Sequence, residues 1–246
     1  MKVVDCLWEI KNIGKRTVEI SIESNDEITG EQLKAIYNNY DYVVIKVPIN
    51  KIDVNTILAD LGFMMIECQY KISKLYKDFN PDDRLIKRLI PKFNFKKVVS
   101  KEDFKGLTDR MTLGMFSTDR IALDPHFGLE DSYRRYKNWM TTEFENRTSE
   151  FLLTCLNEKP IGYCMYKKEN DTVDGLLGGI FEEYQDSGYG LITPLQLFLY
   201  AYKDDEFCFK KMITSISSNN TPVVELYNYL NFRLTDTTYV FVKHLD

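Results

Sequence analysis

Strand-like and helix-like stretches alternate over the first ninety residues. Thr17–Ile22 alternates apolar and polar positions with a period of two, which predicts a half-buried strand. Thr29 is suited to cap a helix that begins near Gly30. Tyr42–Val47 is a β-branched run that Pro48 ends, which predicts a second strand. A helix at 53–60 and a strand at 64–75 complete this series.

The rest of the chain gives a second mixed series. Residues 77–92 are charged and carry two prolines, which indicates a connector with a short helix at 83–90. Residues 114–128 are rich in turn-forming residues. The pattern further predicts a helix at 129–146, strands at 150–156, 161–167 and 172–183, a helix from Gly188 to Tyr202, a strand at 210–217, a helix at 221–230 and strands within 232–243. Such a mixture predicts an α/β or α+β fold.

One segment of the chain occurs twice at a fixed offset. The residues Val54, Leu61, Phe63 and Tyr70 reappear 169 positions later as Val223, Leu230, Phe232 and Tyr239. Both copies predict a helix, a tight turn and a strand, and the order of the elements before each copy also agrees. These agreements favour an internal duplication, although a common pattern at helix ends would give the same letters.

Composition and charge exclude several classes of protein. Apolar residues make up 44% and charged residues 28% of the 246 positions, which indicates one large or two small globular domains rather than a disordered chain. The net charge is 32 − 37 = −5, so the basic footprint of a nucleic-acid binder is missing. Five cysteines without CxxC spacing predict free thiols in a reducing compartment. Neither a signal peptide nor a membrane span is recognisable, so we expect a cytoplasmic protein without a membrane partner.

A short glycine-containing string lies between a predicted strand and a predicted amphipathic helix. It consists of Gln185, Asp186, Ser187, Gly188, Tyr189 and Gly190. Glycines let the backbone approach a ligand closely, and the amides of a helix N-terminus carry partial positive charge, so the string is a candidate pyrophosphate site. It lacks the Gly-Lys-Ser/Thr of a Walker loop and lies too late in the chain for a Rossmann fingerprint. An ordinary glycine turn is the simpler alternative.

Two further polar residues belong to the helix predicted at 221–230. Asn220 begins that helix, and Tyr227 lies seven residues later, two turns along the same face. Both also fit plain structural roles, Asn220 as an N-cap and Tyr227 as a core residue.

Taken together, these residues resemble the GCN5-related N-acetyltransferase (GNAT) family. The family's acyl-CoA loop, Gln/Arg-x-x-Gly-x-Gly/Ala, is matched by Gln185, Gly188 and Gly190. Its later motif, Asn-x-x-Ala-x-x-Leu-Tyr-x-Lys-x-Gly-Phe, is matched by Asn220, Leu226, Tyr227 and Phe232, while Val223 replaces the alanine and Asn231 the glycine. The resemblance covers residues 150–246. It implies a GNAT fold, a central mixed and mostly antiparallel sheet flanked by helices, with acetyl-CoA as co-substrate and no metal.

A second resemblance narrows the family. The stretch Asp119–Phe127, followed by Tyr133–Tyr136 and Trp139, is similar to the dTDP-fucosamine acetyltransferase group, which acetylates a nucleotide-linked 4-amino-4,6-dideoxy sugar. Members of that group carry a smaller N-terminal half of related fold. The resemblance therefore implies a non-catalytic, truncated GNAT-like domain at 1–92 and a catalytic GNAT domain at 93–246.

The resemblance also implies roles for particular residues. The backbone of 185–190 would hold the CoA pyrophosphate, the strand around Ile180 would pair with the pantetheine arm, and Tyr227 would protonate the departing thiolate. Glu182 and Glu183 are open as general bases or as solvated carboxylates. The residues placed near the acceptor amine are His126, Arg134 and Arg135, the arginines meeting a diphosphate; a structural turn histidine and a solvated helix face are the alternatives.

Other functions remain open at this point. The same CoA-binding half would serve a different amine, such as a peptide N-terminus, a polyamine or an antibiotic. A non-catalytic CoA-binding module is an alternative of another class. An exposed sheet edge would let a second copy pair, so a homodimer is also open.

Overall fold

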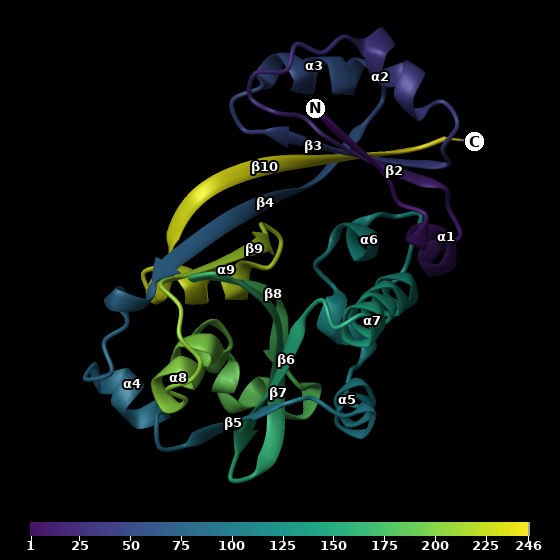
Figure 1. The fold of residues 1–246 in the computed structure, drawn as a ribbon. Helices are drawn as coiled ribbons and strands as arrows, with labels where there is room; N and C mark the ends of the chain where they lie inside the picture. Colours follow the sequence, from purple (N-terminus) through teal and green to yellow (C-terminus); the bar gives the residue numbers. More distant parts are fainter. Residues whose placement is uncertain (246) are drawn as a thin grey trace.

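One mixed sheet of ten strands runs through the whole molecule (Figure 1). The computed structural model describes residues 1–245. The strand order is β1-β2-β3-β10-β4-β9-β8-β7-β6-β5, and only the pairs β2–β3 and β8–β9 are parallel. This mostly antiparallel sheet with helices on its faces confirms the expected fold class.

The strands are β1 (Lys2–Asp5), β2 (Thr17–Ser21), β3 (Tyr42–Pro48), β4 (Met64–Leu75), β5 (Phe93–Lys97), β6 (Glu150–Leu156), β7 (Lys159–Glu169), β8 (Thr172–Ile180), β9 (Lys211–Ser217) and β10 (Arg233–His244). The α-helices are α1 (Trp8–Ile13), α2 (Gly30–Tyr37), α3 (Ile52–Asp60), α4 (Arg84–Leu89), α5 (Lys101–Thr108), α6 (Arg120–Leu123), α7 (Leu129–Glu145), α8 (Gln196–Lys203) and α9 (Thr221–Tyr229). The 3₁₀ helices are η1 (Tyr76–Asp78), η2 (Leu113–Phe116), η3 (Glu182–Ser187) and η4 (Tyr189–Leu195). Among residues 1–245, no helix is long and apolar enough to cross a membrane.

Most predicted elements are confirmed, and the local chemistry explains them. Thr29 caps α2 with a full capping box, because its side chain accepts from the backbone of Gln32 while the Gln32 side chain accepts from the backbone of Thr29. The sequence pattern missed β1, α1, β5 and α5. These elements are four to eight residues long, and so short a stretch carries little periodicity.

The internal repeat extends to whole elements. Adding 169 to the bounds of β3, α3 and β4 gives 211–217, 221–229 and 233–244, which are the bounds of β9, α9 and β10. The pairing obeys the same offset, because Thr238 faces Pro48 while its counterpart Gln69 faces Ser217. Gln69 also faces Thr238, its own equivalent, so a local two-fold axis passes between these two residues.

Each copy gives its last strand to the other half of the sheet. The C-terminal β10 lies between β3 and β4, and β4 lies between β10 and β9. In Figure 1 these two long strands join the N-terminal body at the top to the larger body below. A domain boundary at residue 92 stays a prediction, since β10 belongs to the N-terminal part of the sheet although it ends the chain.

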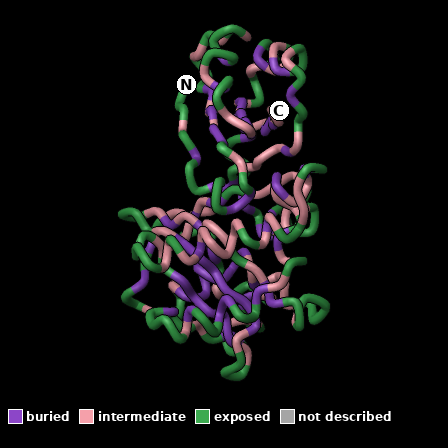
Figure 2. The backbone as a smooth tube through the Cα atoms, turned by 90° about the vertical axis from the view of Figure 1, so that its right-hand side faces the viewer, coloured by how far each residue is buried: buried purple, intermediate pink, exposed green. Residues whose placement is uncertain are grey.

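Helices cover both faces of the C-terminal part of the sheet. Successive residues of β7 point to opposite faces, so that Cys164 and Tyr166 pack in a core with α4, α8 and α9, whereas Tyr163 and Met165 pack in a core with α5 and α7. In the N-terminal part, α2 and α3 cover one face. The other face packs on Ile13 and Ile121, outside the sheet, and this smaller core joins the two bodies. Figure 2 shows buried residues in both bodies, with the larger group in the larger body.

The two repeated helices leave through the same backbone turn. Gly62 after α3 and Asn231 after α9 have φ values of +75° and +57°. This left-handed conformation costs other L-residues energy, and asparagine tolerates it best after glycine. Asn231 therefore replaces the glycine of the family motif without changing the path of the chain.

Replacing Gly62 by alanine should lower the free energy of unfolding by about 1–2 kcal/mol, because the new Cβ is strained at positive φ. Space is not the cause, since the nearest atom to such a Cβ is the Lys243 Nζ at 3.9 Å. Gly106→Ala is the matched control, in an exposed helical position with nothing within 4 Å. The control should be neutral or stabilising by up to about 1 kcal/mol. Urea unfolding measures both, and equal effects would contradict the strain argument.

Candidate active site

The strands β8 and β9 separate after a short stretch of pairing. They are paired only from Thr172 opposite Lys211 to Gly175 opposite Thr214. Beyond these residues β8 continues to Ile180 and β9 to Ser217, each bonded only to its outer neighbour, β7 or β4. A bulge in β8 next to Gly175 accompanies the separation.

A cavity of about 220 Å³ opens where these strands separate. Its walls come from β4, β7, β8, β9, α7, α9, the first residue of α8, η4 and the segment before α7. The polar residues among its lining are Glu67, Gln69, Thr118, Asp119, Arg120, Arg135, Thr193, Gln196, Thr214, Ser215, Ser217 and Asn220, together with the phenols of Tyr136 and Tyr227. Strand β4, from the N-terminal part of the chain, thus helps to build a cavity in the C-terminal body.

Two of the residues singled out in the sequence line this cavity together. Asn220 precedes α9, and Tyr227 lies two turns further on. Tyr227 is only 7% exposed, and its ring meets Phe232 edge to face with centroids 4.7 Å apart. Burial raises the pKa of the Tyr227 phenol well above its usual value. Tyr227 is therefore a neutral hydroxyl donor throughout the physiological pH range.

The glycine-containing string differs from the expectation in one respect. The α-helix predicted from Gly188 to Tyr202 begins only at Gln196, and the two 3₁₀ helices η3 and η4 precede it. Pro194 explains the difference, because it has no N–H and disfavours α-helical backbone at the residue before it. The backbone of Gly188, at φ +75°, does require a glycine.

The glycine-containing string at 185–190 does not present the N-terminus of an α-helix to an anion. Its amides belong to successive tight turns, and the hydroxyl of Ser187 already accepts from the Tyr189 N–H at 3.3 Å. Thr193 and Gln196 line the cavity, whereas Ile180, Gln185, Asp186, Ser187, Gly188, Tyr189 and Gly190 are not among its lining. The assignment of these seven residues to cofactor binding stays a prediction.

Gln196 is a site residue that the sequence analysis missed. It is 1% exposed, yet neither its amide nitrogen nor its amide oxygen has a hydrogen-bond partner. A buried amide without partners is costly. The available signal was a single glutamine at the start of the apolar run Leu197–Tyr200.

Charged groups from α6 and α7 form another part of the wall. The buried carboxylate of Glu9 accepts from Arg135 at 2.7 Å and from Arg120 at 3.2 Å. Asp119 accepts through one oxygen from Ser132 at 2.7 Å. The other carboxylate oxygen of Asp119 lies 3.7 Å from an Arg135 nitrogen, and neither it nor the buried Nε of Arg120 has a hydrogen-bond partner. Both residues line the cavity.

Glu67 is the carboxylate in this cavity whose environment favours its neutral form. It is buried on β4, and its Oε1 accepts from the Gln69 side chain at 3.1 Å. Burial raises the pKa of the Glu67 carboxyl above its usual value, more than its hydrogen bonds lower it. Glu182 and Glu183, the two bases weighed from the sequence, are exposed, and Glu183 pairs with Arg110 at 3.2 Å. Neither of them lines the cavity.

The three residues assigned to the acceptor lie in different places. Arg135 lines the cavity. Arg134 lines a separate shallow hollow, where its Nε donates to the Asn12 carbonyl at 2.6 Å and its guanidinium bonds to Asp131. His126 is 60% exposed and contacts Asp124 and His244 instead. The structure therefore brings only Arg135 together with Tyr227 and Asn220.

Replacing Gln196 by methionine, which has a similar size, should raise the free energy of unfolding by about 1 kcal/mol, because it removes an unpartnered buried amide. Thr214→Val is the matched control. It removes the 2.6 Å bond from the Thr214 hydroxyl to the Gly175 carbonyl and should cost about 1 kcal/mol. Opposite signs in urea unfolding would identify Gln196 as a residue kept for a ligand; destabilisation by both changes would contradict this.

Known structures with a similar backbone identify the fold. No family model and no curated protein matches the sequence. A conserved protein of unknown function from Staphylococcus epidermidis aligns with a TM-score of 0.58 and 15% identity, over 94% of this chain and 85% of that chain. A GCN5-related N-acetyltransferase from Kribbella flavida aligns with a TM-score of 0.57 and 9% identity, over 92% and 80%. A tandem GNAT protein from the clavulanic acid biosynthesis pathway aligns with a TM-score of 0.55 and 10% identity, over 93% and 75%.

At 9–15% identity these structures share the fold of the backbone with this chain. Each alignment covers nearly all of this chain, so the N-terminal body is included with the larger one. The chain therefore adopts the fold of the GCN5-related N-acetyltransferases, in a two-part arrangement.

Proposed function

We propose that this protein is an N-acetyltransferase that moves an acetyl group from acetyl-CoA to a primary amine by direct attack in a ternary complex. The observation that carries the proposal is a single cavity, between two separated strands, that is lined by a buried neutral phenol, Tyr227, and a buried carboxyl, Glu67. Amide formation needs a proton donor for the departing thiolate and an acceptor for the amine proton. The resemblance in fold is consistent with this chemistry.

The separated strands suit the thioester donor. Their inner edges have backbone N–H and C=O groups that the partner strand does not pair, and an extended chain with amide groups can pair with such an edge. The cavity, at about 220 Å³, is smaller than most pockets for whole ligands. It would therefore take the acyl thioester end and the amine, and the rest of the carrier would extend outside.

Tyr227 would protonate the thiolate as the thioester breaks. A phenol with an ordinary pKa near 10 is a weak acid toward a thiol near 8.5, a deficit of about 2 kcal/mol. The burial that raises the phenol pKa also destabilises a free thiolate. A hydrogen bond that tightens while negative charge develops offsets the deficit. Asn220 lines the same cavity and would hold the donor beside the phenol.

Glu67 would take the proton from the attacking amine. An amine enters largely as ammonium and must lose a proton before it attacks. Burial raises the pKa of the Glu67 carboxyl, so its ionised form holds a proton more strongly than an ordinary carboxylate does. Glu67 is therefore the stronger base once it is ionised. The base would then come from β4, the strand that the N-terminal half contributes.

The acceptor that we propose is an amine on a nucleotide-activated amino sugar. Support comes from Arg135 and Arg120, which line the cavity and share the carboxylate of Glu9, because guanidinium groups pair well with phosphate. The nucleotide part of this proposal rests on these two arginines, since His126 and Arg134 do not line the cavity.

Release of free CoA in the presence of acetyl-CoA and a panel of amines tests the proposed function. We expect turnover with a thymidine-diphosphate amino sugar and weaker turnover with polyamines or peptide N-termini. If the enzyme prefers a simple amine, the proposed acetyltransferase activity stands but the amino-sugar acceptor is wrong. Binding of acetyl-CoA without turnover of any amine would instead favour a non-catalytic CoA-binding module.

Replacing Tyr227 by phenylalanine should lower kcat by about 10²–10⁴-fold, because it removes the proton donor. The KM for acetyl-CoA should change little, since the ring and its packing on Phe232 remain. Tyr229→Phe is the matched control, because Tyr229 lies on the same helix and is exposed. Steady-state kinetics of both variants decide the matter, and an active Tyr227→Phe enzyme would remove Tyr227 from the mechanism.

Replacing Glu67 by glutamine should lower kcat/KM. It should also flatten the acidic side of the plot of kcat/KM against pH. A base works only when deprotonated, so the wild-type rate should rise with pH through the raised pKa of Glu67. Glutamine cannot ionise, and that rise should disappear. The exposed Glu183→Gln is the control and should keep the wild-type profile. A Glu67→Gln profile with an unchanged acidic limb would assign the base to another group.

A further inference from the structure

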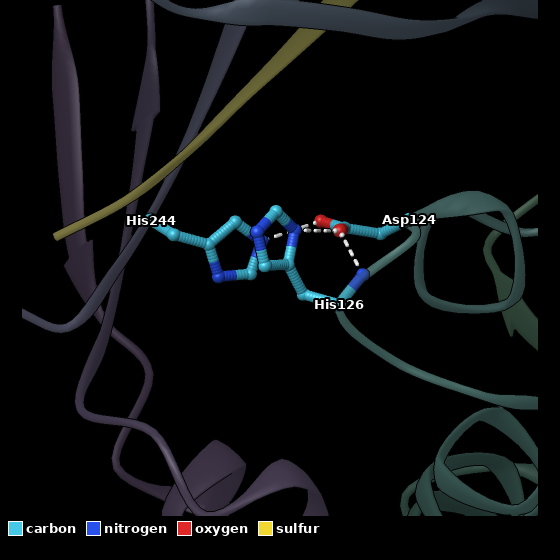
Figure 3. A group of neighbouring side chains, drawn as sticks. All are labelled: Asp124, His126 and His244. Carbon is cyan, nitrogen blue, oxygen red and sulfur yellow. Dashed lines mark hydrogen bonds and ion pairs between the residues drawn. The ribbon is translucent and has the colours of Figure 1, made fainter. Parts of the chain in front are cut away.

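Both histidines of the chain meet a single buried carboxylate outside the cavity. His244 ends β10, whereas Asp124 and His126 belong to the loop between α6 and α7 (Figure 3). Asp124 is fully buried, and its two carboxylate oxygens are shared between the rings. One oxygen lies 3.1 Å from the His126 Nδ1, and the other lies 2.8 Å from the His244 Nε2.

This donor set is chemically specific. The ligand atoms of the three residues all lie within 4.8 Å of one another. Two imidazoles and one carboxylate are ligands that Zn²⁺ and similar divalent transition metals accept, and three protein ligands leave one position for water. In a tetrahedral site with bonds near 2 Å, neighbouring ligand atoms are roughly 3.3 Å apart. The two nitrogen-to-oxygen distances are already close to that spacing.

A buried phenol lies beside the same carboxylate. The Tyr42 hydroxyl is buried next to Asp124 without a well-aligned hydrogen bond. The ring of Tyr42 lies against that of His244, with centroids 4.8 Å apart. A carboxylate that ligates a metal usually takes a further hydrogen bond from such an outer group. Tyr42 is in position to be that donor.

We propose that Asp124, His126 and His244 bind one divalent transition metal ion, with Zn²⁺ as the preferred occupant. Binding requires one rearrangement. The two imidazole rings are now stacked, with centroids 3.9 Å apart and planes 27° from parallel, so their nitrogen lone pairs do not yet converge. His126 is 60% exposed, and its ring has room to tilt toward the carboxylate. Each nitrogen that binds the ion gives up the proton that it now shares with Asp124.

The metal would connect the end of β10 to a loop that reaches the cavity. Asp124 follows directly after α6, and α6 with its N-cap carries Arg120 and Asp119, two of the cavity residues. Ile121 of the same helix packs in the small core between the two bodies. A bound ion would therefore hold these charged side chains in place, as a structural rather than a catalytic site.

The test uses the full-length chain without an affinity tag, stripped by a chelator and carrying Cys208→Ser. That background removes the exposed thiol that would compete for the metal. Titration with Co²⁺, followed by its visible absorption, and with Zn²⁺, followed by calorimetry, reports stoichiometry and affinity. We expect one ion per chain and a thermal midpoint that rises with Zn²⁺ concentration.

His126→Ala and Asp124→Asn should each weaken the Kd for Zn²⁺ by at least about tenfold, as the loss of even an outer partner does in known sites. His126 is exposed, so its variant should remain folded and keep the test decisive. Tyr42→Phe should weaken binding less than either. Absence of saturable Co²⁺ binding, or an affinity that His126→Ala leaves unchanged, would overturn the proposal.

Discussion

The antiparallel pair of β4 and β10 is the interaction on which the rest of the molecule depends. Each of these strands is hydrogen-bonded only to strands of the other copy, because β4 lies between β10 and β9 while β10 lies between β3 and β4. Removing the pair would leave two open sheets with unpaired edges, which are unstable in water. The same pair carries Glu67 to the cavity and His244 to the loop between α6 and α7. The exchange of strands therefore sets both candidate sites.

The repeat also explains why the candidate active site opens beside β8 and β9 rather than in the first copy. In both halves a parallel pair, β2–β3 or β8–β9, precedes a repeated helix. The pair β2–β3 stays bonded along all five residues of β2, whereas β8 and β9 part after four. Lys51 and Leu58 occupy the positions of Asn220 and Tyr227 in the first copy. The N-terminal half thus keeps the framework without the opening or the phenol.

Much of the fold was predictable from local signals, because those signals act over a few residues. The capping box at Thr29, the run that Pro48 ends and the repeated turn at Gly62 and Asn231 each fix a short stretch of backbone. The start of α8 is also set locally. The glycines at 188 and 190 predict a helix start there, but Pro194 delays the α-helix to Gln196.

The candidate site was predictable only in part. Asn220 and Tyr227 stand on one helix, so a motif can reveal them, and both line the cavity. Glu67, Gln196 and the Glu9–Arg120–Arg135 group are brought there by contacts between residues far apart in the chain. A carboxylate on a half-buried strand looks ordinary until the fold shows that it faces a cavity. Burial and missing partners, which distinguish these residues, are properties of the folded state.

The place of β10 has a consequence for synthesis on the ribosome. The strand that completes the N-terminal body is made long after β3 and β4, so that body keeps an exposed gap between these strands until residues 233–244 have been synthesised. Domains commonly fold as they emerge, but here the first half finishes only with the second. A chain that stops before residue 233 would lack the strand between β3 and β4, so its N-terminal body could not complete its sheet.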